Sequence, residues 1–141
     1  MDEEKKNIIG TEIDVINEAE QVVNKLQRNN RGAIALTTSQ LRKFLAAVNS
    51  LTNRIKVYKI QSANPEVLSD ELAAEVRYLQ VKLVYQIGRE TGRELPIKDF
   101  VNKAHLLEKI KGIGKNTKKY EQFAVYVEAL VAYRKFQGGD K

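Results

Sequence analysis

The sequence predicts an all-α fold: a compact bundle of about five helices that forms a single domain over residues 1–141. Two observations lead to this prediction. Apolar residues recur every three or four positions along several long stretches, which is the spacing of one face of a helix. Clusters rich in Gly, Pro and Asn separate these stretches, and no stretch alternates apolar with polar residues as a half-buried strand would.

The first helix is predicted over residues 12–28 and the second over residues 37–60. The first has an apolar stripe that consists of Ile13, Ile16, Ala19, Val23 and Leu26. The second begins at Thr37 and Gln40, which have the spacing of a capping box, so that each side chain can satisfy a backbone N–H at the helix start. Its apolar stripe is Leu41, Phe44, Leu45, Val48, Leu51 and Ile55.

The third helix is predicted to follow the break at Pro65 and to run from Ser69 or Asp70, either of which can cap it, to about Glu90. Its main apolar stripe is Leu72, Val76, Leu79, Leu83 and Ile87. A second apolar face carries Val81, Val84 and Gly88. Because a helix that is apolar on two faces is typically buried, we expect the third helix at the centre of the bundle.

The fourth helix is predicted over residues 97–111, ending at the Gly112-Ile113-Gly114 segment, and the fifth from Asn116 or Thr117 to about Phe136. The inward residues of the fourth helix are Phe100, Val101, Ala104, Leu107 and Ile110. Those of the fifth are Tyr120, Phe123, Ala124, Val127, Leu130 and Val131. Arg134 continues this last stripe, so its side chain either extends along apolar surface to reach water or points into a groove.

The composition excludes several classes of site. There is no cysteine and His105 is the one histidine, so neither a disulfide nor a thiolate metal site is possible. Without a second imidazole, a P-loop or a metalloprotease motif, we predict no catalytic residue, no metal site and no cofactor. The charged N-terminus lacks the apolar core of a signal peptide and no apolar run is long enough to cross a membrane, so we expect a cytoplasmic protein without a membrane partner.

The charge distribution indicates a polyanion as the partner. The net charge is +6, but residues 1–20 carry seven acids and two bases. Residues 21–65 contain no acid and eight bases, which are Lys25, Arg28, Arg31, Arg42, Lys43, Arg54, Lys56 and Lys59. A long basic segment without acids is typical of a protein that binds nucleic acid, although such a segment is also found on faces that serve only solubility.

The bases of the second helix fall on two flanks of its apolar stripe. At about 100° per residue, Lys43 and Arg54 lie close together on one flank, while Arg42 and Lys56 lie on the other. In the third helix, Tyr78, Lys82, Tyr85 and Arg89 recur at helical spacing. Aromatic rings beside cations can stack on bases, but the same spacing suits amphipathic side chains that line a helix–helix groove, and we favour this second interpretation.

An alternative function comes from residues 110–115, Ile-Lys-Gly-Ile-Gly-Lys, which resemble the hairpin of helix-hairpin-helix DNA-binding motifs. In those motifs, backbone amides freed by glycine grip a phosphate. The resemblance fails at Lys118, where the motif usually has a small residue, and an ordinary glycine helix stop explains Gly112 equally well. A stand-alone DNA-binding protein that uses Gly112-Gly114 is therefore the alternative hypothesis.

Four segments in order resemble a known family. They are Leu36-Thr37-Thr38-Ser39-Gln40-Leu41-Arg42-Lys43, residues 79–90 (LQVKLVYQIGRE), Ile97-Lys98-Asp99-Phe100-Val101, and residues 128–136 (EALVAYRKF) followed by Gly138-Gly139. In this order they are similar to the small subunit of the type III-A CRISPR interference complex, the Csm complex. The resemblance covers a core of about residues 34–139, whereas the acidic segment of about residues 1–30 carries none of it and is expected to vary.

This resemblance implies a non-catalytic, all-helical subunit of an antiviral defence complex. Several copies would stack head to tail beside the backbone and large subunits, and their basic faces would bind the duplex of guide RNA and target RNA, chiefly its target strand. RNA contact carries over to Arg42, Lys43, Arg54, Lys56 and Lys59 of the second helix, and also to Arg77, Arg89 and Arg134. Because the guide decides the duplex sequence, such a subunit must bind the backbone rather than the bases. The acidic N-terminal segment could contact the basic middle of the next copy.

Overall fold

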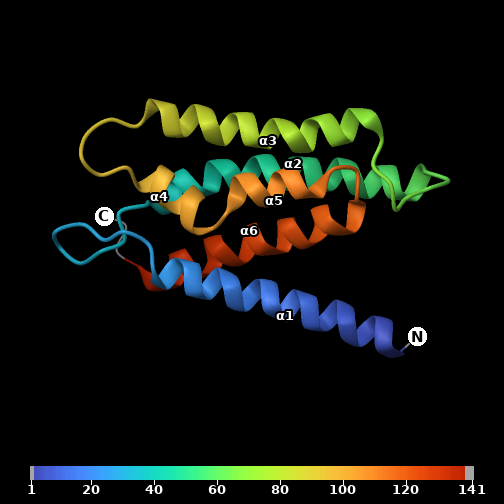
Figure 1. Ribbon diagram of the computed structural model, residues 1–141, viewed down its shortest axis with the longest axis horizontal. Helices are drawn as coiled ribbons and strands as arrows, with labels where there is room; N and C mark the ends of the chain where they lie inside the picture. Colours follow the sequence, from blue (N-terminus) through green and yellow to red (C-terminus); the bar gives the residue numbers. More distant parts are fainter. Residues whose placement is uncertain (1, 139–141) are drawn as a thin grey trace.

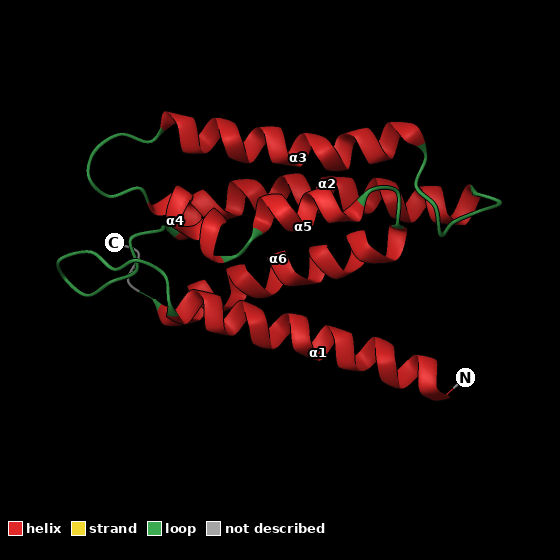
Figure 2. Ribbon diagram, viewed as in Figure 1, coloured by secondary structure: helices red, strands yellow, loops and turns green. Residues whose placement is uncertain are grey.

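A computed structural model (Figure 1) describes the backbone of residues 2–138 and the side chains of residues 12–138. The acidic side chains before Glu12 and the Gly139 of the last family-like segment therefore lie outside the described residues. The described chain forms α1 (Asp2–Asn24), α2 (Thr38–Gln61), α3 (Asp70–Arg89), α4 (Pro96–Lys103), α5 (Leu106–Ile113) and α6 (Thr117–Gln137). No strand occurs within residues 2–138, only two isolated bridges, and the predicted all-α bundle is confirmed (Figure 2).

Four helices form a closed ring of contacts: α2 packs on α3, α3 on α5, α5 on α6, and α6 on α2. The short α4 joins α3 to α5, and α1 lies along the outer side of α6, at the edge of the molecule opposite α3 (Figure 1). The core between these helices is apolar and includes Val48, Leu79, Leu106 and Leu130. None of the helices among the described residues is long and apolar enough to span a membrane.

The expectation that α3 is the central helix is wrong, and α6 occupies that place. α6 packs against α1, α2 and α5, and its buried residues span about half of its circumference. They are Thr117, Tyr120, Phe123, Tyr126, Val127, Leu130, Val131 and Arg134. α3 buries only one stripe, and Val81 and Val84 on its second face are each 52% exposed. The sequence reports that a face is apolar, but not whether another element of the same chain covers it.

The predicted fourth helix over residues 97–111 is also wrong, because two helices, α4 and α5, replace it. His105 separates them with a left-handed backbone, at φ 54° and ψ 39°. In one continuous helix Leu106 would lie about 200° around the axis from Ala104. The break reorients the chain so that both residues are fully buried, while Leu107 is left only partly buried.

Helix ends follow local signals at most places. The predicted capping box at Thr37 and Gln40 is present in both directions, and Ser69 and Asn116 cap α3 and α6 with their side chains. The α2, α3 and α6 boundaries therefore agree with the predictions within one or two residues. Gly112 is the exception: it lies inside α5, and the helix ends instead at Gly114, whose φ of 55° favours glycine.

Candidate nucleic-acid interface

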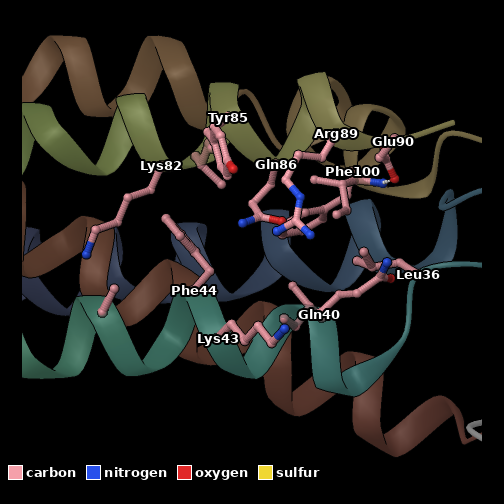
Figure 3. A pocket seen from close by; sticks show the side chains of 14 residues that line it. Leu36, Gln40, Lys43, Phe44, Lys82, Tyr85, Gln86, Arg89, Glu90 and Phe100 are labelled. Carbon is pink, nitrogen blue, oxygen red and sulfur yellow. Dashed lines mark hydrogen bonds between the residues drawn. The ribbon is translucent and has the colours of Figure 1, made fainter.

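The structure brings two predicted RNA-contact residues, Lys43 and Arg89, together with Lys82 in a groove between α2 and α3. Lys43 comes from α2, and Lys82 and Arg89 come from α3. In Figure 3, the side chains of Lys82 and Arg89 extend from α3 toward α2, and Lys43 lies on α2, which forms the opposite wall. The groove has a volume of about 520 Å³, and its lining also includes Gln40, Phe44, Tyr85, Gln86, Glu90 and Phe100.

These three cations have no acidic partner among residues 12–138, where Lys43, Lys82 and Arg89 form no ion pair. The Arg89 guanidinium instead lies 5.7 Å from the centre of the Tyr85 ring, within cation–π range. Glu90 is the acid in the groove lining, and its carboxylate accepts hydrogen bonds from the backbone N–H groups of Ile97 (2.8 Å) and Lys98 (2.9 Å). The groove is therefore positively charged.

Two predicted RNA-contact residues of α2 are instead paired with acids of other helices. Arg54 forms ion pairs with Glu75 and, at 3.6 Å, with Glu71, both on α3, and the hydrogen bond with Glu75 raises the pKa of Arg54. Lys59 forms an ion pair with Glu121 of α6 at 2.8 Å. A stretch of sequence without acids is thus not a surface without acids, because neighbouring helices supply them.

Arg42, Lys56 and Arg77 are exposed and form no ion pair within residues 12–138. The helical positions of Arg42 and Lys56 put them on the flank of α2 away from Lys43, as the sequence predicted. Arg77 is two residues from the buried Leu79 and therefore points to the outer face of α3. These three cations can contact a large polyanion but do not line the groove.

Arg134, another predicted RNA-contact residue, lies in the interior of the protein. Its side chain is fully buried, with 0% exposure. Its Nε donates to the carbonyl of Leu36 at 2.6 Å and its Nη1 to the carbonyl of Gly138 at 2.8 Å. Arg134 thus ties α6 to the segment that leads into α2, and we leave it out of the interface. Its place in the apolar stripe was the signal, since a charged residue among inward positions needs internal hydrogen bonds.

The geometry does not favour the alternative DNA-binding hairpin. Gly112 is helical, so it does not free backbone amides for a phosphate. At the start of α6, the N–H of Thr117 donates to the carbonyl of Glu66 at 3.2 Å, and the N–H of Lys119 donates to Oδ1 of Asn116 at 3.0 Å. Amides that a phosphate would need are therefore already engaged.

His105 and the acidic side chains are the other groups on which chemistry could depend. No group of three metal-ligating residues occurs among the described residues. His105 is exposed, and its Nδ1 lies 3.3 Å from the carboxylate of Glu108. The arrangement of side chains can bind an anionic backbone, and the groove adds an aromatic ring and amides to that surface.

Comparisons with known proteins agree on one family. The family described as Csm2 Type III-A matches residues 11–140 of this chain. A relative from Streptococcus thermophilus is 41% identical, with 92% of this chain and 95% of the relative covered. Relatives from Mycobacterium tuberculosis (strain CDC 1551 / Oshkosh; 42% identical, 87% of this chain and 90% of the relative) and Enterococcus italicus (35%, 86% and 87%) are also similar. All three are named "CRISPR system Cms protein Csm2".

Proposed function

Since the chain belongs to the Csm2 family of type III-A CRISPR systems, we propose that it holds the duplex of guide RNA and target RNA by its sugar-phosphate backbone. Membership of this family makes the chain a small subunit of the type III-A CRISPR complex. Our proposal adds the RNA contact, the absence of catalysis, the cytoplasmic location and a role in antiviral defence. The observation that carries it is the set of exposed cations on α2 and α3 without acidic partners among residues 12–138: Arg42, Lys43, Lys56, Arg77, Lys82 and Arg89.

The physical argument is that protein cations which neutralise phosphates release the counterions held by the RNA. Binding is therefore strongest at low salt. Arg54 and Lys59 would contribute less, because each must give up an ion pair to contact RNA. The cations occupy two helices that pack on each other, so they are held in fixed positions relative to a rigid duplex. No base-specific hydrogen bond is needed, which suits a subunit that must accept any guide sequence.

We also propose that several copies stack along the complex and contact its backbone and large subunits. The outer face of α1 supports this, because Ile13 is 51% exposed and Glu12, Asp14 and Glu20 form no ion pair within residues 12–138. Glu18 is not available, since it pairs with Lys109 of α5 at 2.9 Å. Several weak copies in a row would bind one duplex tightly by multivalency. A chain that stays monomeric in sedimentation velocity, both free and on long RNA duplexes, would contradict stacking.

The test of RNA binding is a four-site variant with Arg42, Lys43, Lys56 and Arg89 each changed to Gln. Its affinity for a short RNA duplex, measured by fluorescence anisotropy across a salt series, should fall. The slope of log K against log salt should become shallower by roughly 3 units, because each phosphate that a cation neutralises accounts for about 0.7–0.9 of the slope.

The matched control changes Lys25, Lys111, Lys118 and Lys119 to Gln. These lysines are exposed and lie away from the groove, and their replacement removes the same amount of charge. The control should keep most of the affinity and the slope. An equal loss in both variants would show that net charge alone drives binding. A loss confined to the control, with duplex DNA preferred, would favour the alternative DNA-binding hairpin.

A further inference from the structure

We propose that the groove between α2 and α3 is a binding site for a single unpaired nucleotide of an RNA strand, with its base against Tyr85. The inference rests on the proposed RNA contact and adds the class of ligand and the residues that recognise it. Its basis is that one groove contains an exposed ring, two carboxamides with unused hydrogen-bonding groups, and cations on both walls (Figure 3).

The ring is the first part of the site. Tyr85 is 63% exposed although it lines the groove, so a large aromatic surface is left in contact with water. The Arg89 guanidinium, 5.7 Å from the ring centre, restricts where the ring lies. Stacking a base on such a ring removes apolar surface from water and does not depend on which base it is.

The carboxamides are the second part. Gln86 points into the groove in Figure 3 and makes no hydrogen bond within residues 12–138. Gln40 accepts a hydrogen bond from the N–H of Thr37 through Oε1, at 2.9 Å, and its NH₂ group remains available. A carboxamide both donates and accepts, so it can meet the polar edge of any base once that edge is not used in base pairing.

The charges are the third part. Lys43 stands on the α2 wall, and Lys82 and Arg89 stand on the α3 wall, so a phosphate that enters the groove meets cations from both sides. The carboxylate of Glu90 is turned to the backbone N–H groups of Ile97 and Lys98, whose dipoles stabilise its negative charge. The volume of about 520 Å³ lies within the roughly 300–1,000 Å³ of small-molecule sites.

An unpaired nucleotide fits these parts and a paired one does not. Within a duplex both faces of a base are covered by its neighbours and its edge is occupied by its partner. A ring and a carboxamide can reach only a base that has left the stack. The groove would therefore bind bulged or unpaired positions, while the exposed cations outside it follow the duplex.

The experiment compares two RNA duplexes that differ in one chemical group: one carries a single bulged adenosine, the other a bulged abasic ribose at the same position. Both have the same backbone and charge, so only the base differs. Anisotropy titrations with the full chain should show about tenfold tighter binding of the adenosine bulge, which corresponds to one base stacked on an aromatic side chain.

Tyr85→Leu should remove this preference and leave the affinity for the abasic duplex unchanged, and Gln86→Ala should reduce the preference in part. The matched control is Tyr78→Leu, since Tyr78 is 57% exposed on the same helix and has Lys82 5.9 Å from its ring, but does not line this groove. Equal affinities of the wild-type chain for the two duplexes, or a preference that Tyr85→Leu retains, would overturn the inference while leaving the proposed duplex contact intact. Failure to bind either duplex would overturn both.

Discussion

Toward α6, α2 forms a packed seam, whereas part of its α3 side borders an open groove. On the α6 side, Phe44 and Phe123 meet edge to face at 6.4 Å between ring centres. The buried Tyr120 hydroxyl donates to the carbonyl of Val48 at 2.9 Å and lies 2.8 Å from the hydroxyl of Thr52. On the α3 side, Lys43 has no acidic partner among residues 12–138, and water reaches the space between the helices.

One helix can therefore serve stability and binding at once. Aromatic burial and internal hydrogen bonds on the α6 side contribute to the free energy of folding. Exposed cations contribute little to stability, so the α3 side is free to present them to a ligand. We therefore expect substitutions around α6 to change the unfolding free energy and substitutions in the groove to change RNA binding.

The largest effect is expected for Arg134→Met. The buried carbonyl of Leu36 loses its donor while the side-chain volume is nearly kept, and the unfolding free energy should fall by about 3 kcal/mol. Urea unfolding followed by circular dichroism measures this change. Lys135→Met is the control, since Lys135 is exposed on the same helix and should change stability little. Unchanged stability with reduced RNA affinity would instead return Arg134 to the interface.

An intermediate effect is expected for Tyr120→Phe, which removes the hydroxyl that links α6 to α2. The expected loss is about 1–2 kcal/mol, and Tyr133→Phe, whose hydroxyl makes no hydrogen bond within residues 12–138, should cost less. The result to look for is a lower urea midpoint with an unchanged dependence on denaturant. Equal losses in the two variants would mean that the hydrogen bonds of the Tyr120 hydroxyl do not contribute to the free energy of unfolding.

Tyr120→Phe also changes the response to alkaline pH. Burial raises the pKa of Tyr120 from 10.0 to about 12, so the folded protein keeps the phenol protonated longer than the unfolded chain does. The stability that this proton provides is complete below pH 10 and is lost as the pH rises through 12. The wild-type chain should thus lose more stability across this interval than Tyr120→Phe does. Parallel pH curves would contradict a buried, protonated Tyr120.

The smallest effect on stability is expected for the four-site variant with Arg42, Lys43, Lys56 and Arg89 changed to Gln. These side chains are exposed and form no ion pair within residues 12–138, so the unfolding free energy should stay within about 1 kcal/mol of the wild-type value. The same protein should bind RNA more weakly than the wild-type chain. A loss of stability as large as that of Arg134→Met would remove the distinction between the two sides of α2.

Much of the fold could be predicted from the sequence because its signals are local. The capping box at Thr37 and the caps at Ser69 and Asn116 act within three residues, and apolar periodicity acts within one turn. The break at His105 could not be predicted in this way. The break lets Ala104 and Leu106 both reach the core. Their burial depends on packing against α3 and α6, which are distant in the sequence, and not on their neighbours in the chain.

The candidate site was predicted only in part. Lys43 and Arg89 were named from the sequence, but that they share a groove follows from how α2 packs on α3. Lys82, Tyr85 and Gln86 were part of a helical stripe or family-like segment, and no local feature marked them as neighbours of Lys43. The helical spacing of Lys82, Tyr85 and Arg89 is visible in the sequence, but it suits both stacking on bases and a helix–helix groove, so it does not single out a binding site.

The amino-acid sequence is enough to show that the protein is helical, basic, without cysteine and similar to a family of CRISPR subunits. Which cations are paired depends on the tertiary fold, because the groups that bind them lie far away in the chain. Glu75 is 21 residues from Arg54, Glu121 is 62 from Lys59, and Leu36 is 98 from Arg134. Helix formation depends on residues within about one turn, whereas burial and ion pairing depend on which helices meet.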